Sequence, residues 1–200
     1  MTSPQASLRP VAVAVTGGIG AGKSEALRAF ARHGAATVSA DEIVHRLYED
    51  GEVQRALVDR WGERVRGPDG IDRKQVGEIV FGDRSELEWL EGLLHPRVVA
   101  EQARLRDELA GAADPPAVVV VEVPLLYETG AESRFDAVVV ITAPPEIRAQ
   151  RTTVADAAER TRRLLPDDEK VARADFSYVN DSSLEELDAF VADVVAKLTA

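Results

Sequence analysis

The stretch Val11-Ala-Val-Ala-Val-Thr-Gly-Gly-Ile-Gly-Ala-Gly-Lys-Ser24 decides the fold of this chain. Its first five residues are small or β-branched, which is typical of a strand buried on both faces. The next residues match the pattern G-x-x-x-x-G-K-[ST], and apolar residues at helical spacing then continue to Gly34. A strand, a glycine loop and a helix in this order predict a phosphate-binding loop; the alternative is a glycine-rich turn without a ligand.

Each residue type in this loop has a physical role in binding a nucleoside triphosphate. The glycines let backbone N–H groups converge on phosphate oxygens, and the start of the following helix adds a positive dipole. The Lys23 ammonium reaches the β- and γ-phosphates, and the Ser24 hydroxyl is a ligand for Mg²⁺. The predicted ATP-binding residues of this segment are Gly17, Gly18, Gly20, Ala21, Gly22, Lys23, Ser24 and Glu25.

The rest of the chain predicts an α/β fold with a parallel sheet covered on both faces. Four more short apolar runs are expected to be strands, at residues 36–38, 117–123, 137–141 and 176–179. Residues 51–111 have a helical pattern with breaks at Gly67-Pro68, Gly82 and Pro96, and we expect no strand within them.

Composition narrows the possible functions. The chain has 24 basic and 35 acidic side chains, a formal net charge of −11, which argues against a nucleic-acid partner bound through a broad basic face. No apolar run approaches the roughly 18 residues of a membrane span, so no membrane partner is expected. The absence of cysteine excludes disulfides and thiol catalysis and fits a cytoplasmic protein. We predict small-molecule ligands and make no prediction of oligomeric state.

Three further features fit a small kinase, and each has a structural alternative. Asp41 follows the second strand, where its carboxylate either accepts a proton from the phosphoryl acceptor or helps to hold the metal; the structural alternative is a cap for a helix starting at Glu42. Glu122 lies within an apolar strand and either faces the site at the strand's end or pairs with another buried group. Residues 148–173 carry seven basic and five acidic side chains, as either a lid over polyphosphate or a solvated helix.

Other classes of nucleotide-binding protein fit the chain less well. No N-K-x-D pattern is present, so a guanine-specific G-protein is not indicated. A motor or transporter ATPase usually has a longer chain with an aspartate at the end of an apolar strand.

Five segments in sequence order resemble the dephospho-coenzyme A kinase family, which belongs to the P-loop nucleoside-monophosphate-kinase group. The similarity extends from about Val11 to Leu187. The segments are the glycine loop Thr16–Ser24, Ser39-Ala-Asp41, Leu94-His-Pro-Arg97, Val123-Pro-Leu-Leu-Tyr-Glu128, and Lys170 with Ala174-Asp175-Phe176 and Asn180.

The resemblance implies a P-loop kinase fold with a five-stranded parallel sheet. The core would take residues 11–50, 115–147 and 174–200, a helical substrate insertion residues 51–111, and a lid residues 148–173. The implied reaction transfers the γ-phosphoryl group of ATP to the ribose 3′-hydroxyl of dephospho-coenzyme A, the last step of coenzyme A biosynthesis, with ATP and Mg²⁺ as cofactors.

The resemblance also implies roles for individual residues. Lys23, Asp41, Arg151 and Arg160 would be catalytic. Asn180 would lie near the adenine of ATP. The residues expected to bind the acceptor are Asp41, His95, Pro96, Arg97, Glu122 and Pro124.

The chain departs from the family pattern at three places. Ser39 stands where the family has an aspartate, Glu122 replaces an aspartate, and the segment between Arg151 and Arg160 is shorter than the family's. Arg148, Arg162 or Arg163 would substitute for the missing lid charge, and the sequence does not distinguish among them. Two alternative functions follow: a kinase for another small hydroxyl or nucleotide acceptor, and a nucleotide-binding homologue with weakened catalysis.

Overall fold

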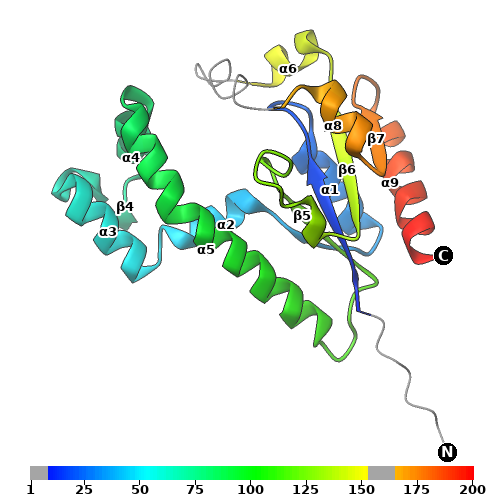
Figure 1. Cartoon of the computed structure of the whole chain (residues 1–200), viewed down its shortest axis with the longest axis horizontal. Helices are drawn as coiled ribbons and strands as arrows, with labels where there is room; N and C mark the ends of the chain where they lie inside the picture. The colour runs from blue at the N-terminus through cyan, green and yellow to red at the C-terminus, as the bar shows by residue number, and fades with distance from the viewer. Residues whose placement is uncertain (1–8, 153–164) are drawn as a thin grey trace, which may run out of the picture. The chain divides into compact units, whose positions relative to one another are not determined.

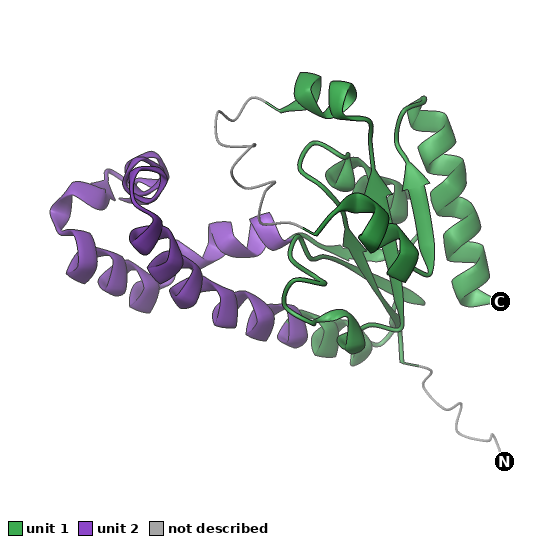
Figure 2. Ribbon diagram, turned by 45° about the horizontal axis from the view of Figure 1, so that its top comes forward, with its two compact units in different colours: residues 1–39, 105–200 green, residues 40–104 purple. Residues whose placement is uncertain are grey.

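The chain forms two compact units, coloured separately in Figure 2. A computed structural model describes residues 9–152 and 165–200. The first unit takes residues 1–39 and 105–200, and the second takes residues 40–104. Each unit has its own hydrophobic core.

The first unit contains the predicted parallel sheet. Its strand order is β2-β5-β1-β6-β7, and every neighbouring pair is parallel. The strands are β1 (Val11–Thr16), β2 (Ala36–Val38), β5 (Val118–Glu122), β6 (Ala137–Thr142) and β7 (Phe176–Val179). All five expected strands are confirmed. Because β1 is central, the loop that leaves its carboxyl end emerges between its two neighbours, the position where open α/β sheets bind ligands.

Alternate residues of β1 face two different apolar layers, which explains its uninterrupted apolar sequence. Val13 and Val15 pack into the cluster that contains Phe30 of α1 (Lys23–Arg32). Ala14 packs on the opposite side against Leu126. The first cluster also takes Leu187, Val191 and Val194 of α9 (Leu184–Thr199), so α1 and α9 cover the same face of the sheet (Figure 1).

The described part of the first unit also contains shorter elements. They are the 3₁₀ turn η2 (Glu132–Arg134), α6 (Pro145–Arg151) and α8 (Asp167–Arg173). Gly34, with φ +83°, follows the end of α1 and confirms the predicted stop of that helix. The Ser183 hydroxyl accepts from Glu186 N at 3.3 Å and caps α9.

The second unit is mostly helical. Its elements are α2 (Ala40–Leu47), α3 (Gly51–Trp61), η1 (Glu63–Val65), β3 (Arg66–Gly67), β4 (Gly70–Ile71), α4 (Arg73–Gly82) and α5 (Arg84–Ala110), whose last turns belong to the first unit. Its core is built around Leu57, Trp61 and Val76. The carboxylates of Asp50 and Asp72 accept backbone N–H groups at the starts of α3 and α4 and fix where these helices begin.

Two predictions for this region are wrong. A two-residue antiparallel pair, β3 with β4, interrupts the stretch expected to lack strands, because Pro68 and Gly70 (φ +126°) let the chain reverse there. The break expected at Pro96 is absent, since α5 continues through it. The proline removes one backbone donor from the helix, and Arg97 Nη1 donates to Leu93 O, a carbonyl in the turn before the proline, at 2.9 Å.

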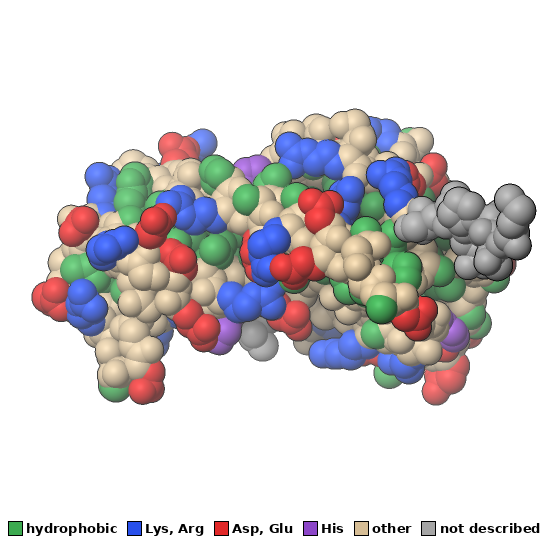
Figure 3. Space-filling view, turned by 90° about the horizontal axis from the view of Figure 1, so that it is seen from below, with side chains coloured by type: hydrophobic (Ala, Val, Ile, Leu, Met, Phe, Trp, Pro, Cys, Tyr) green, Lys and Arg blue, Asp and Glu red, His purple; other side chains and the backbone are tan. Residues whose placement is uncertain are grey.

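The surface is mixed in charge. Figure 3 shows acidic and basic side chains interspersed over the face that it draws. Among the helices of residues 9–152 and 165–200, none combines the length and apolar character needed to cross a bilayer.

Candidate active site around the phosphate loop

The loop between β1 and α1 has a backbone that only glycine fits at key positions. Gly17 has φ +144°, and a Cβ there would lie 1.9 Å from Ile141 O of β6. Gly22 has φ +101°, and a Cβ there would lie 2.1 Å from Asn180 Nδ2. Side chains at these positions are therefore excluded both by conformation and by close approach. The loop leads into α1 at Lys23, so its N–H groups sit at a helix start suited to anions.

The Lys23 ammonium lies folded over this loop. Its Nζ donates to Gly18 O at 3.1 Å and lies 3.9 Å from Glu122 Oε1. Glu122 is the last residue of β5 and is only 5% exposed. The two predicted alternatives for Glu122 are thus both met: it ends its strand beside the loop, and its buried charge has a cationic partner.

Asn180 holds the far side of the loop. Its Nδ2 donates to Ala21 O at 2.8 Å, and its backbone N donates to Thr142 O at 2.7 Å. Asn180 is 4% exposed, so its side-chain amide is buried against the loop and hydrogen-bonds to the loop backbone. A contact between Asn180 and adenine stays a prediction.

Residues of α6 also lie against the loop. Arg151 Nη1 donates to Asn180 O at 3.4 Å. A Cβ on Gly20 would lie 2.6 Å from Thr152 Oγ1, the residue that follows α6. Arg160, predicted to be catalytic, lies outside the described residues, as do Arg162, Arg163 and most of the segment that is shorter than the family's.

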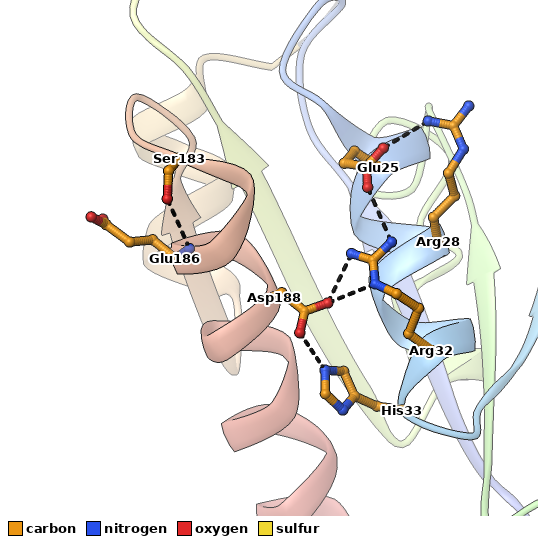
Figure 4. A network of polar contacts seen from close by, with 7 residues as sticks. All are labelled: Glu25, Arg28, Arg32, His33, Ser183, Glu186 and Asp188. Atoms are coloured by element: carbon orange, nitrogen blue, oxygen red, sulfur yellow. Dashed lines mark hydrogen bonds and ion pairs between the residues drawn. The ribbon is translucent and has the colours of Figure 1, made fainter.

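Ser24 and Glu25 begin α1 beside Lys23. The Glu25 carboxylate pairs with Arg28 at 2.8 Å and with Arg32 at 3.3 Å, which directs the side chain along the helix surface (Figure 4). Hydrogen bonding from Arg28 lowers the pKa of Glu25. The Glu25 side chain is therefore already paired within α1, and its part in ATP binding stays a prediction.

The residues predicted for the acceptor fall in two places. Pro124 follows Glu122 in the first unit, whereas Asp41, His95, Pro96 and Arg97 belong to the second unit. Helix α2 begins at Ala40, so Asp41 lies in its first turn and does not cap a helix starting at Glu42. His95, Pro96 and Arg97 lie on successive positions of α5, and Arg97 Nη2 is 3.9 Å from Glu52 Oε2.

The sequence analysis did not predict a buried ion pair that the structure contains. Lys170 Nζ of α8 lies 2.8 Å from Glu128 Oε1, and the Lys170 side chain is 0% exposed. Leu165 N also donates to Glu128 Oε1, at 2.9 Å. Burial by itself raises the pKa of Glu128, but the Lys170 ammonium and backbone donors outweigh burial and hold that pKa below its usual value. Glu128 and Lys170 both belong to segments that resemble the dephospho-coenzyme A kinase family. That resemblance is the sequence feature that could have pointed to the pair.

The arrangement suits a magnesium ion bound mainly through a nucleotide. Within residues 9–152 and 165–200, histidine and acidic side chains form no group of three able to hold a metal. The Ser24 hydroxyl stands next to Lys23, which contacts the Glu122 carboxylate. One or two protein oxygens with phosphate oxygens and water is the ligand set that Mg²⁺ prefers, so the residues present fit it.

Comparisons with known proteins identify the family of this chain. The sequence model of the family described as dephospho-CoA kinase matches residues 11–186. A dephospho-CoA kinase of Streptomyces avermitilis is 41% identical over 194 residues, covering 93% of each chain. One from Thermobifida fusca is 36% identical over 194 residues, covering 93% of this chain and 95% of the relative.

Solved structures show the same fold. The dephospho-CoA kinase from Campylobacter jejuni superposes with a TM-score of 0.69 at 27% identity, covering 94% of this chain and 96% of that one. A shikimate kinase from Acinetobacter baumannii, at 16% identity and a TM-score of 0.54 over 94% of each chain, shares the fold alone. The chain belongs to the dephospho-CoA kinase family.

Proposed function

We propose that this protein transfers the γ-phosphoryl group of ATP to the ribose 3′-hydroxyl of dephospho-coenzyme A, giving ADP and coenzyme A, the last step of coenzyme A biosynthesis. The observation that carries the proposal is the phosphate loop, in which Lys23 is held between Gly18 O and Glu122 beside a helix start. The family assignment over residues 11–186 supports the choice of acceptor.

The chain's own residues bind and orient the triphosphate. Backbone N–H groups of the loop receive the β- and γ-phosphates, and the Lys23 ammonium moves from Gly18 O to the phosphate oxygens. Asn180 keeps the loop backbone in place through Ala21. Arg151, which lies beside Gly22 and Asn180, adds positive charge where the phosphoryl group transfers.

Transfer forms one oxygen–phosphorus bond and breaks another. The acceptor 3′-oxygen attacks the γ-phosphorus, the bond to the β–γ bridging oxygen breaks, and ADP leaves with that electron pair. The Asp41 carboxylate accepts or orients the proton of the hydroxyl. Ser24, with Glu122 nearby, would hold Mg²⁺, whose charge neutralises the phosphate oxygens when it is bound.

A direct assay tests the proposal. Purified protein with ATP, Mg²⁺ and dephospho-coenzyme A is expected to yield ADP and coenzyme A in equal amounts by liquid chromatography, and excess EDTA is expected to stop the reaction. Thermal-shift arms with AMP, gluconate and shikimate check other acceptors, since a bound ligand raises Tm. A protein that binds both substrates yet converts none over hours would overturn the proposal.

We also propose that the protein is cytoplasmic and that it binds neither nucleic acid nor a membrane. These proposals rest on composition, and fractionation of cells expressing the natural protein tests the location.

A further inference from the structure

Two pairs of opposite charge converge on Gly18 of the phosphate loop. The first is Lys23 with Glu122, described above. The second joins Arg148 of α6 to Asp167, the first residue of α8, with Arg148 Nη1 3.0 Å from Asp167 Oδ2. A Cβ on Gly18 would lie 2.5 Å from Arg148 Nη1 and 3.4 Å from Asp167 Oδ1. The guanidinium thus rests directly on the loop backbone.

The position of Arg148 depends on more than its side chain. Its backbone N donates to Pro144 O at 3.0 Å, which sets it in the first turns of α6. Its backbone oxygen would lie 3.0 Å from a Cβ on Gly20. Glycines at 18 and 20 therefore leave the space that Arg148 occupies, and both its main chain and its side chain line the loop.

The pair between Arg148 and Asp167 is only partly open to solvent, with side chains 22% and 27% exposed. Exposed ion pairs contribute little because water screens them, but a pair next to a binding loop also acts on any charge bound there. The guanidinium has five N–H donors in a planar fork that matches phosphate oxygens. A triphosphate carries more negative charge than one carboxylate and can compete with Asp167 for these donors.

We propose that Arg148 is a further triphosphate-binding residue of this loop, and that Asp167 is a positioning residue that holds the guanidinium in place and competes with phosphate for it. On binding, the Arg148 donors turn from the Asp167 carboxylate to phosphate oxygens, with no proton transfer because arginine stays charged. The inference deepens the proposed function at its ATP site and requires nothing of the acceptor.

If the Arg148 donors exchange Asp167 for phosphate, substitutions of Arg148 and of Asp167 should change ATP affinity in opposite directions. Arg148→Gln removes the donors and weakens ATP binding about tenfold, whereas Arg148→Lys keeps the charge and recovers part of the loss. Asp167→Asn removes the competitor and a nearby negative charge, so it tightens ATP binding about threefold. In the double variant the gain from Asp167→Asn disappears, because no guanidinium remains to be released.

Isothermal titration of the full chain with ATP, inorganic triphosphate and adenosine tests this without any acceptor. Triphosphate is expected to follow ATP through the series, and adenosine affinity is expected not to change. Lys197→Gln and Asp193→Asn, which separate an ion pair on α9, are the charge-matched controls and are expected to leave all three affinities within twofold. Thermal unfolding of each variant checks that it is folded.

Several results would overturn the inference. One is an Arg148→Gln variant that is folded and binds ATP like the wild type, which would make the pair structural. Another is a gain from Asp167→Asn that persists without Arg148, which would reduce Asp167 to a simple repelling charge. Failure of the wild type to bind triphosphate would also overturn it. Intact binding without phosphoryl transfer would count against the proposed function alone.

Discussion

At the scale of single residues, Lys23 carries the strongest expectation. Its ammonium donates to Gly18 O of the loop, so Lys23→Ala is expected to weaken ATP binding about 100-fold, roughly 2.7 kcal/mol. Titration calorimetry checks this, with Lys197→Ala on α9 as a control that keeps wild-type affinity. Because the change also removes the ion pair with the buried Glu122 carboxylate, urea unfolding should show a loss of stability. Unchanged ATP affinity would remove Lys23 from the site.

Asp41 is expected to act on turnover and not on ATP binding. Asp41→Asn keeps the shape of the side chain but loses the proton acceptor, so kcat should fall about 100-fold or more while the Kd for ATP stays within twofold. Glu42→Gln, the neighbouring exposed acid in the same turn of α2, is the matched control and should retain activity. An equal loss of turnover and ATP affinity would assign Asp41 to structure instead.

At the scale of elements, the Glu128–Lys170 pair ties α8 to the segment that follows β5. Lys170→Met is expected to lower the free energy of unfolding by about 3 kcal/mol, because a largely buried carboxylate loses its partner. The double change Glu128→Gln and Lys170→Met should recover much of that loss. Urea unfolding measures both, and Lys197→Met on the exposed face of α9 should cost under about 0.5 kcal/mol. A small effect of Lys170→Met alone would contradict this account.

Helices α1 and α9 are joined by a polar network that gives the fold a dependence on pH (Figure 4). Asp188 accepts from His33 Nε2 at 2.9 Å and from Arg32 at 2.8 Å, and these bonds lower its pKa, that from His33 most. A lowered folded-state pKa stabilises the fold above the unfolded value, about 3.9, and this stabilisation is lost as pH falls through the folded value.

Asp188→Asn is therefore expected to lower Tm at pH 7, by roughly 2 °C. The difference from wild type should shrink as pH falls below the unfolded-state pKa, about 3.9, and through the lower folded-state pKa of Asp188. Thermal unfolding monitored by circular dichroism from pH 3 to 7 measures both trends. A difference that is constant across this range would show that charge on Asp188 is not the cause.

At the scale of the whole molecule, protection of the second unit is expected from dephospho-coenzyme A and not from ATP. The phosphate loop belongs to the first unit, and Asp41, His95 and Arg97 belong to the second. In hydrogen-exchange mass spectrometry, ATP alone should slow exchange in residues 17–25, and dephospho-coenzyme A alone should slow exchange in peptides containing residues 41 and 93–98. Protection by dephospho-coenzyme A that is confined to the first unit would contradict the acceptor-binding roles proposed for Asp41, His95 and Arg97.

Much of this protein follows from local sequence patterns. The five strands, the glycine loop and the end of α1 could be predicted because apolar periodicity, glycine and capping residues act within a few neighbours. The same local rules mispredicted a break at Pro96, through which α5 continues, and missed the short β3–β4 pair.

The tertiary structure alone decided which distant residues meet. Asn180 reaches Ala21, Lys170 reaches Glu128, and Arg148 reaches Gly18 and Asp167. Sequence patterns record which residue types are present at each position, but such contacts depend on how the strands are ordered and how the loops close over them. The sequence therefore determined that a triphosphate site exists, and the folded chain determined which side chains surround it, because a parallel sheet brings its loops together at one edge.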